Sequence, residues 1–599
     1  MGRRAGSAGC RPKQSPAGPS PLATTASPTF QFSLGSVADP LNIGGHPSDA
    51  NVSVGRSHVC VTARAALACY TKGGRIVMAP TAANAFFSGF GFTGLFDLRT
   101  GYDHFRDRFW VIGLTNWGDA ATQDKLVIAV SRTGDPRDGW YQYWTDAYGA
   151  VSATGNNADY PLIGFDSTAV YLSNIVDYPD GAGTTRYSHI VLFRAADMAA
   201  GKAMSSVQGW RFWNLTNPSG NIIRSIMTPV NSHTALSRGF FLNRRNSNLI
   251  DVYALNNPLT AAQSWTVRAV TLASFGSPNT APQLLDSWAT TAKPVKFDNL
   301  GTEALNAHYR DGRIVFAGND ERNWDGAGDR PSVRLVKLNV TNLDAIAVEI
   351  DRTFGARSAG ETAYFGYGWA GVGINASAEI ALGYVRTGDT IFPQLRVSSW
   401  LPGDTDIRSS ALATNGFATF QSFPSLTQIW YDTANASIDP VDDDGIYFAQ
   451  QYPTTLYGNV NNNFRMLVFK MFGQVLPDLV PLSVQSSATS VTRGASFSVT
   501  LSVANDGDAT MPAFSGEVRL STNTFFSTAD VLCSSFAQTA LSYLAEPRAV
   551  VVTCTAPATM AAGTYHVGTL LDSGNAAAET DEANNANPTF VTFPTLQVL

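Results

Sequence analysis

Short runs of alternating apolar and polar residues follow one another from Asn51 to Gly473, separated by turns rich in Gly, Asp or Asn. Alternation with a period of two predicts β-strands. Helical periodicity is nearly absent, and we expect a short helical turn only at 194–201. The clearest predicted strand pairs are 108–114 with 125–131, 169–173 with 189–193, and 313–317 with 333–338.

This strand pattern recurs about every 50–60 residues, a period typical of propeller blades. A single four-stranded sheet cannot bury both of its faces, whereas radially stacked sheets cover one another. We therefore predict an all-β protein in which residues 45–475 form a seven-bladed β-propeller, with six blades as the alternative. The seven units begin near Val52, Phe96, Asp159, Ile222, Ala304, Tyr364 and Phe420.

A change of composition after Gly473 leads into a second all-β segment, residues 477–599. Its length and short alternating strands predict an immunoglobulin-like β-sandwich. Residues 1–40 are rich in Pro, Ser, Ala and Thr, which is typical of a disordered leader or tether. This leader lacks the apolar segment of a signal peptide.

The charge content limits the class of function. The 599 residues are 44% hydrophobic and 15% charged, with a net charge of −6. No basic patch is present, which excludes a nucleic-acid binder. No run of about 18 apolar residues occurs, so we expect no transmembrane helix. Asp greatly outnumbers Glu, and because Asp favours turns, this bias also fits a β protein.

Four of the five cysteines fall into two local pairs. Cys60 and Cys69 flank a turn predicted near Ala65, and if the turn centres between Arg64 and Ala65 they face each other across two strands. Cys533 and Cys554 both lie in the C-terminal segment. Two disulfides would indicate an oxidising compartment, whereas the alternative is that all four are buried thiols. No cysteine or histidine spacing indicates a zinc site.

The C-terminal segment resembles the CARDB domain, a bacterial cell-adhesion-related sandwich. The resemblance implies an extracellular protein in which this module assists adhesion or contact with a substrate. It does not account for the cysteine pair. The residues that carry it are Pro477–Val480, Val503–Gly507, Gly563–Tyr565, Asp572 and Glu579–Asn585.

The large domain resembles a group of exported bacterial propellers whose functions are mostly unassigned. The resemblance implies the fold and export, and it supplies no catalytic residues. The matching segments are Phe96–Asp103, Arg108–Trp110, Ala129–Pro136, Trp140–Tyr141, Asp159–Pro161, Tyr171–Ser173, Ala381–Tyr384, Trp430–Asp432 and Ile438–Asp442.

In a propeller the innermost strand of each blade starts near the central axis, so ligand-binding groups are expected at these starts. Carboxylates accept hydrogen bonds from sugar hydroxyl groups, and aromatic rings stack on sugar faces. The residues predicted at these positions are Arg99, Asp159, Arg224, Asn306, Tyr364 and Asp432. The alternative for each is a structural role in turns or blade contacts.

Two kinds of chemistry are compatible with these residues. Asp159 and Asp432 would be the acid/base pair of a glycoside hydrolase if one of them has a raised pKa. His308, with His233, would serve a polysaccharide lyase, for which Arg224 would neutralise a uronate. Sialidase chemistry is not expected, because the repeated Ser-x-Asp-x-Gly-x-Thr-Trp turns are absent.

An acidic turn at 439–445 is the one candidate for a metal site. Asp439, Asp442 and Asp444 bring oxygen ligands close together, which suits Ca²⁺. The turn lacks the distal Glu of an EF-hand, and the alternative is a solvent-exposed turn. We expect no other cofactor.

These features predict a secreted or cell-surface protein that binds or adheres. Its propeller would recognise a polysaccharide or another cell-surface ligand, and the CARDB-like module would be accessory. A secreted carbohydrate-active enzyme with its site at the propeller axis is the second hypothesis. A scaffold for protein partners, which predicts a large exposed apolar patch, is the third.

Overall fold

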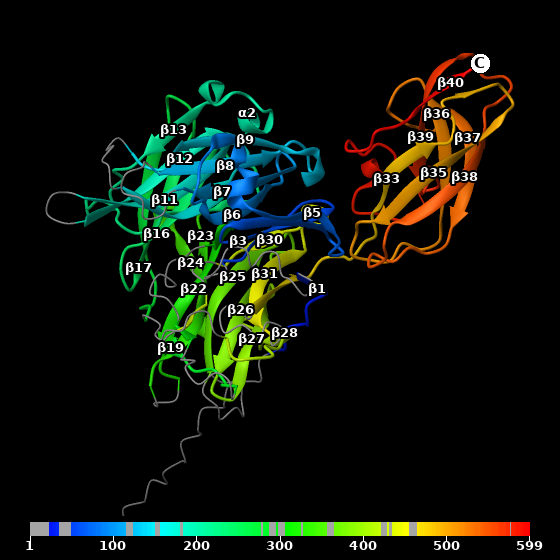
Figure 1. The fold of residues 1–599 in the computed structure, drawn as a ribbon. Coiled ribbons are helices and arrows are strands. Elements are labelled where there is room, and N and C mark those ends of the chain that lie inside the picture. Colours follow the sequence, from blue (N-terminus) through cyan, green and yellow to red (C-terminus); the bar gives the residue numbers. More distant parts are fainter. Residues whose placement is uncertain are drawn as a thin grey trace, which may run out of the picture.

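The structure is a computed structural model in which strands predominate (Figure 1). It describes residues 23–34, 49–115, 124–149, 156–179, 184–276, 280–286, 295–296, 306–324, 328–355, 365–420, 428–430, 434–454, 464–575 and 577–599.

The first three blades are four-stranded antiparallel sheets whose strands follow chain order from the inside outward. Their strands alternate so that both faces of each sheet bury apolar side chains against neighbouring blades. Blade 1 contains β2 (Asn51–Val54), β3 (His58–Ala63), β4 (Ala66–Thr71) and β5 (Ile76–Ala82). Blade 2 contains β6 (Phe96–Asp103), β7 (Arg108–Leu114), β8 (Lys125–Ser131) and β9 (Trp140–Asp146). Blade 3 contains β10 (Asn157–Phe165), β11 (Ala169–Pro179), β12 (Thr184–Arg194) and β13 (Gly209–Phe212).

Blades 4 to 6 continue this plan, and blade 5 gains the short parallel strand β15 (Asn231–Ser232) at its inner edge. Blade 4 contains β14 (Thr228–Pro229), β16 (Arg238–Arg244), β17 (Leu249–Asn256) and β18 (Ser264–Thr271). Blade 5 contains β21 (Asn306–Arg310), β22 (Arg313–Arg322), β23 (Arg330–Asn339) and β24 (Ala347–Phe354). Blade 6 contains β25 (Phe365–Ile374), β26 (Ile380–Gly388), β27 (Ile391–Trp400) and β28 (Ala411–Thr414).

Blade 7 is completed by the N-terminal part of the chain. Its strands β30 (Ala436–Ile438), β31 (Ile446–Pro453) and β32 (Phe464–Met471) are joined by β1 (Phe30–Leu34), which pairs with β32 from Phe30 opposite Lys470 (Figure 1). This corrects the assignment of residues 1–40 to a disordered leader, since 30–34 belong to the propeller. The strand supplies hydrogen bonds to an edge that β32 would otherwise expose.

The seven sheets close into a ring, as the sequence predicts. The inner strands lie beside one another in the order β2, β6, β10, β14, β21, β25, β30 and back to β2. Apolar clusters fill the spaces between blades. Trp110 of blade 2, for example, packs against Phe165 of blade 3, and Val468 of blade 7 shares a cluster with Val52 of blade 1.

Five of the seven inner strands begin within two residues of the predicted starts. Blade 4 begins at Thr228 rather than near Ile222, and blade 7 at Ala436 rather than near Phe420. The apolar residues around Phe420 resemble the start of an inner strand. The rings of Phe420 and Trp430 are instead fully buried in the core, before the strand begins. A small sheet lies nearby in the chain, formed by β19 (Thr280–Ala281), β20 (Val295–Lys296) and β29 (Gln428–Ile429).

The C-terminal domain is a sandwich of a three-stranded and a five-stranded sheet around one apolar core. The first sheet contains β33 (Leu479–Ser486), β35 (Ser496–Asn505) and β38 (Arg548–Thr555). The second contains β34 (Ser490–Val491), β40 (Thr595–Val598), β39 (Gly563–Leu571), β36 (Phe514–Ser521) and β37 (Val531–Gln538).

Helices are short and lie outside the sheets. The predicted helical turn at 194–201 is confirmed by α2 (Ala195–Ala199). The others are α1 (Ala83–Phe86) and the 3₁₀ turns Ser88–Phe90, Pro136–Asp138, Met204–Ser206, Leu343–Ala345 and Glu582–Asn585. Within the described part of the chain, no helix is long and apolar enough to cross a membrane.

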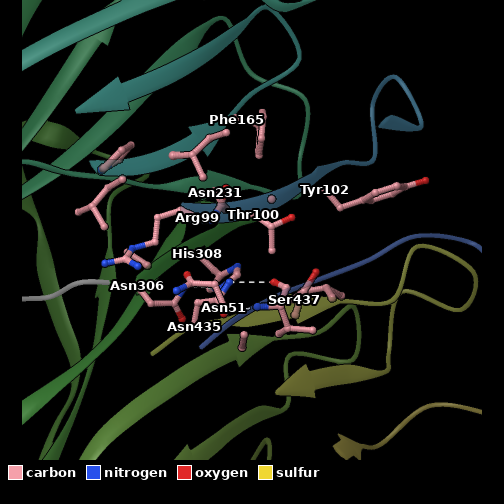
Figure 2. A pocket seen from close by; sticks show the side chains of 18 of the residues that line it. Asn51, Arg99, Thr100, Tyr102, Phe165, Asn231, Asn306, His308, Asn435 and Ser437 are labelled. Carbon is pink, nitrogen blue, oxygen red and sulfur yellow. Dashed lines mark hydrogen bonds between the residues drawn. The ribbon is translucent and has the colours of Figure 1, made fainter. Parts of the chain in front are cut away.

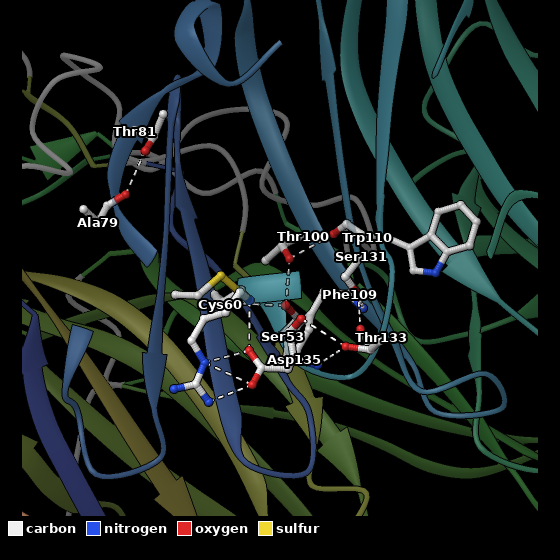
Figure 3. Close-up of a disulfide and its surroundings, with 12 residues drawn as sticks. Ser53, Cys60, Ala79, Thr81, Thr100, Phe109, Trp110, Ser131, Thr133 and Asp135 are labelled. Carbon is white, nitrogen blue, oxygen red and sulfur yellow. Dashed lines mark hydrogen bonds and ion pairs between the residues drawn. A yellow bond between two sulfur atoms is a disulfide. The ribbon is translucent and has the colours of Figure 1, made fainter. Parts of the chain in front are cut away.

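Both predicted disulfides are present. Cys60 and Cys69 lie directly opposite each other on β3 and β4, with an S–S distance of 2.04 Å and a Cα–Cα distance of 4.1 Å (Figure 3). Such a short Cα separation fits a non-hydrogen-bonded pair in an antiparallel ladder. Cys533 on β37 is bonded to Cys554 on β38, so this bridge joins edge strands of the two sandwich sheets.

Candidate functional site

Three inner strands contain the same backbone irregularity. The pairing register shifts near the start of β6 and β10 and in the middle of β25. The residue in each bulge has a positive φ, of 53° at Asp97, 54° at Tyr160 and 52° at Trp369. Left-handed backbone is uncommon for residues other than glycine, and bulges redirect side chains beside functional sites. This repeated bulge therefore marks the face on which the inner strands begin, here called the entry face.

A pair of carboxyl groups lies on the entry face between blades 2 and 3. Asp97 of β6 is hydrogen-bonded to Asp159 of β10, and both side chains are half-buried. Burial raises the pKa of Asp97 to about 6, although the charge of Arg99 opposes this. Burial and the charge of Asp97 raise the pKa of Asp159 to about 7. Two carboxyl groups this close share a proton near neutral pH, so they behave as one acid rather than two anions.

Arg99 continues the same strand toward the axis and is 1% exposed. Its Nη1 donates to the carbonyl oxygen of Leu98 at 3.3 Å, and its Nη2 lies 3.8 Å from Oδ2 of Asp49. Among the described residues, its Nε and Nη2 have no hydrogen-bond partner. A buried guanidinium with uncommitted donors is costly. Arg99 is therefore a candidate to contact an oxygen-rich group or ordered water in the axial cavity.

The axial cavity has a volume of about 50 Å³ and is lined by inner-strand residues, among them Arg99, Asn306, His308 and Ser437. Figure 2 shows Arg99 and Asn306 on one side of the cavity and Ser437 on the other. Sites for small molecules usually measure about 300–1,000 Å³, and this volume holds only on the order of three waters. The cavity as it stands is therefore too small for a sugar ring.

Three histidine rings are stacked at the far end of this cavity. The ring centroids of His104 and His233 are 5.4 Å apart and those of His233 and His308 are 5.1 Å apart. Nε2 of His233 and Nδ1 of His308 are hydrogen-bonded at 2.8 Å. Burial lowers the pKa of His104 to about 4 and that of His308 to about 3, so the stack is neutral. These rings fill the axis on the face where the inner strands end, here called the exit face.

A larger groove opens beside blade 4 on the entry face. It has a volume of about 720 Å³, and Arg224 and Ser225 lie just before β14, which starts at this face. Blade 3 borders the groove, because Oγ of Ser188 donates to the carbonyl oxygen of Ser225. The pKa of Arg186, two residues before Ser188, is raised by its hydrogen bond to Asp177 and by the charges of Asp177 and Asp159. The groove is lined by Asn217, Gly220, Asn221, Ile222, Ile223, Arg224, Ser225, Asn243, Arg244, Arg245 and Asn246.

The residues predicted for a shared hub separate into three groups. Arg99 and Asn306 meet in the axial cavity, as does the lyase candidate His308, and Asp159 lies where the inner strands begin. Arg224 is exposed in the groove and does not line the axial cavity. Tyr364 and Asp432 lie outside the described residues.

Asn306 also has a structural role. Its Oδ1 accepts a hydrogen bond from the backbone N–H of Val372 in blade 6 at 3.1 Å. Asn435 makes the equivalent contact from blade 7 to Val52 of blade 1. Asn306 therefore fits the alternative expectation, a structural contact between blades, as well as it fits ligand binding.

The acidic turn after β30 differs from a solvent-exposed loop. Asp439 is 2% exposed, and both of its oxygens accept from Nζ of Lys72 at 2.8 Å. Asp442 accepts from the backbone N–H groups of Asp444 and Gly445, and Oδ1 of Asp444 accepts from that of Ser377. Among the described residues, no three His, Cys, Asp or Glu side chains are arranged to hold a metal ion. These contacts connect the turn to Lys72 of blade 1 and to Ser377 of blade 6.

The C-terminal sandwich docks on the exit face through Asp506. This carboxylate, 1% exposed in its side chain, lies 3.3 Å from Nη2 of Arg137 and 3.8 Å from Nε2 of His58, and it also pairs with Arg75. Burial raises the pKa of Asp506, but the neighbouring His58 and the two guanidinium groups outweigh burial and hold this pKa below its usual range. The guanidinium of Arg137 also lies 3.9 Å from the ring centroid of Phe590.

A second ion pair reinforces this contact. Nζ of Lys470 at the end of blade 7 lies 2.6 Å from Oδ2 of Asp508, and both side chains are 1% exposed. The two ion pairs thus hold the C-terminal sandwich against the exit face of the propeller. The entry face, with the carboxyl pair and the groove, lies at the opposite ends of the strands.

Seven radially stacked sheets followed by a two-sheet sandwich define a β-propeller joined to an immunoglobulin-like domain. Residues 476–589 match the CARDB family, so the C-terminal domain is a CARDB domain, as the sequence predicts. No curated protein sequence matches the chain.

Solved structures similar to the chain divide between its two domains. A CARDB domain from Pyrococcus furiosus in complex with di-metal ions is 19% identical and covers 22% of this chain and 94% of its own, with a TM-score of 0.16. An α-L-arabinanase from Cellvibrio cellulosa is 10% identical and covers 53% and 95%, with a TM-score of 0.27. A Hadza microbial sialidase is 10% identical and covers 69% and 76%, with a TM-score of 0.32. At these TM-scores the similarities carry no inference about activity.

Sequence reasoning missed Asp97, Arg244 and Arg245. Asp97 lies one residue into β6, and its pairing with Asp159 depends on the bulges in two blades. Arg244 and Arg245 follow the second strand of blade 4, which returns to the entry face. The cluster Arg244-Arg245-Asn246 was visible in the sequence, and a search of second-strand ends would have found it.

Proposed function

We propose that this protein is an extracellular polysaccharide-binding protein whose ligand lies on the entry face of the propeller. The CARDB domain would be an accessory module, held on the exit face and out of the path of the ligand. Two disulfides support an oxidising, extracellular location.

The observation that carries the proposal is the contrast between the two openings. The groove of about 720 Å³ is large enough for a saccharide, whereas the axial cavity of about 50 Å³ is not. Four asparagines line the groove, of which Asn221 and Asn246 are exposed and Asn243 is buried in the wall. An amide both donates and accepts hydrogen bonds, as each sugar hydroxyl does, so this lining suits vicinal hydroxyl groups.

Several of these amides are already held in place. Nδ2 of Asn243 donates to Oγ of Ser225 and to the carbonyl oxygen of Ile226, both at 2.8 Å. Oδ1 of Asn217 accepts from the backbone N–H groups of Ser219 and Asn221. Side chains fixed before binding lose less conformational entropy on binding.

The test is a panel of soluble polysaccharides incubated with the full chain, with retention by affinity electrophoresis and release of reducing ends measured in parallel. The proposal predicts retention by at least one polysaccharide without new reducing ends or unsaturated products. Retention that survives Asn221→Ala and Asn246→Ala together, or no retention by any member, would contradict it.

A glycoside hydrolase is the second candidate, and the protonated Asp97–Asp159 pair favours it. A general acid must hold its proton near neutral pH, and the raised pKa of Asp159 meets this need. The two carboxyl groups are too close to divide the acid and nucleophile roles between them, which require about 5 Å or more. In a hydrolase Asp159 would be the acid, and Asp432 remains the candidate base.

Release of reducing ends that Asp159→Asn abolishes, with an unchanged melting temperature, would establish this second function. Its absence across the panel would favour binding alone.

A further inference from the structure

We propose that the groove on the entry face recognises an acidic polysaccharide, with Arg224 binding the carboxylate of a uronate residue. The inference rests on the proposed function and specifies its ligand class. It comes from the distribution of charge in the groove and from the contacts of three arginines.

The groove is a positive region on a negative protein. Its lining contains three arginines, four asparagines and one serine, and no carboxylate. The chain as a whole has a net charge of −6. Because concave regions lined by one sign of charge concentrate ligands of the opposite sign, an anionic ligand is favoured here over most other parts of the surface.

The three arginines differ in what already holds them. Arg245 forms an ion pair with Asp251, with Nε 2.8 Å from Oδ2, and Asp251 is fully buried behind it. Nε of Arg244 donates to the carbonyl oxygen of Asn246 at 3.2 Å, and its guanidinium lies 5.2 Å from the ring centroid of Phe275. Both side chains are therefore largely fixed in the wall of the groove.

Arg224 is exposed and makes no ion pair or side-chain hydrogen bond with the described residues. Its backbone is nonetheless held, since Ile223 before it donates to Leu215 and accepts from Ser188, and the carbonyl oxygen of Ser225 after it accepts from Ser188. Arg224 thus presents five uncommitted N–H donors from a positioned backbone.

A guanidinium is planar and binds a carboxylate through two parallel hydrogen bonds, which gives direction as well as charge attraction. The nearby amides supply contacts for the hydroxyl groups of the same sugar. The half-exposed side chain of Ile222, at 49%, offers an apolar contact for a sugar ring. A uronate combines these three features in one residue, a carboxylate, hydroxyl groups and an apolar ring face.

The nearest carboxylates leave this charge in place. Asp251 neutralises Arg245, and Asp177 is paired with Arg186 on the bordering hairpin, with Nε 2.7 Å from Oδ1. Within the described part of the chain, Arg224 forms no ion pair, so its charge is available to a ligand.

The experiment compares the full chain with two variants on three probes. Arg224→Gln removes the charge, and Arg352→Gln makes the same change at a half-exposed position on the outer strand β24. The probes are polygalacturonate, the same polymer fully methyl-esterified, and dextran sulfate, each titrated by calorimetry in dilute buffer and again at about 0.15 M salt.

The inference predicts that polygalacturonate binds at least about tenfold more tightly than its methyl ester. Arg224→Gln should weaken polygalacturonate binding about tenfold, leave the methyl ester unchanged and so remove the preference, while Arg352→Gln behaves as wild type. The preference should decrease with salt.

Other outcomes separate the inference from the proposed function. Equal binding of polygalacturonate and its ester, unaffected by Arg224→Gln, would overturn the acidic-ligand inference and leave polysaccharide binding intact. Tighter binding of dextran sulfate than of polygalacturonate would overturn the uronate assignment. No binding of any probe or of any member of the polysaccharide panel would overturn the proposed function itself.

Discussion

The side-chain amide of Asn435 in blade 7 is hydrogen-bonded twice to the backbone of Val52 in blade 1. Its Oδ1 accepts from the Val52 N–H at 2.8 Å, and its Nδ2 donates to the Val52 carbonyl oxygen at 2.9 Å. These blades lie almost 400 residues apart in the chain, so the contact closes the ring between its first and last inner strands. The closure determines whether the entry face exists as one surface.

Asn435→Ala should therefore lower the free energy of unfolding by about 1–3 kcal/mol, because it leaves the Val52 N–H and carbonyl oxygen without partners. Urea denaturation followed by tryptophan fluorescence measures this change. Asn415→Ala is the matched control, since Oδ1 of Asn415 accepts one exposed hydrogen bond from Gln394. Equal stabilities of the two variants would argue against a closing role for Asn435.

The Cys60–Cys69 disulfide bridges two strands inside the fully buried part of blade 1 (Figure 3). Replacing both cysteines by Ala should lower the free energy of unfolding by about 2–3 kcal/mol, because a short closed loop no longer restricts the unfolded chain. Guanidinium denaturation of the oxidised proteins measures the difference. A double variant with the wild-type midpoint would show that the bridge contributes no stability.

Asp506 joins the CARDB domain to the propeller through Arg75, Arg137 and His58. Asp506→Asn should separate the domains, since removing one partner of a buried ion pair costs about 3–5 kcal/mol. Small-angle scattering should then show a larger radius of gyration, and proteolysis should cut the linker near Gly473 faster.

Glu517→Gln is the control for this change, because the Glu517 side chain pairs with Arg519 of the same strand inside the sandwich. A compact, protease-resistant Asp506→Asn variant would contradict the account of the interface.

The shared proton of Asp97 and Asp159 makes stability depend on pH. Both folded-state pKa values, about 6 and about 7, lie above the ordinary value of 3.8. Because both pKa values are raised in the folded state, the protonated pair stabilises the fold. This stabilisation is complete below about pH 4 and is lost as the pH rises through 6 and 7.

Asp97→Asn should weaken this dependence, because it removes the neighbouring charge that raises the pKa of Asp159. Melting temperatures between pH 4.5 and 8 should fall more steeply for the wild type than for Asp97→Asn. Parallel curves would show that the pair does not share a proton.

The sequence predicted the ring because each blade repeats its own alternation of apolar and polar residues. It placed Arg99 and Asn306 at inner-strand starts, and both residues line the axial cavity, because the inner strands share the axis by symmetry. It could not predict that histidine rings fill that axis, because the stack joins the turn after β6 to segments of blades 4 and 5.

Two other errors have physical causes. The strand Phe30–Leu34 was assigned to a leader because its partner β32 is more than 400 residues away, so no local hairpin signal exists. The sequence predicts either a Ca²⁺ site or a solvent-exposed turn at Asp439, and it does not reveal the ion pair with Lys72, because Lys72 belongs to a different blade. Both contacts are long-range, and strand periodicity contains no information on them.

The central claim is that ligand binds on the entry face of the propeller, in the groove beside blade 4. Hydrogen exchange measured by mass spectrometry, with and without saturating polygalacturonate, tests it most directly. The account predicts slower exchange in peptides covering 215–226 and 241–248, and no change in 71–76 or 505–509 on the exit face. Protection confined to the exit face or to the CARDB domain would contradict it.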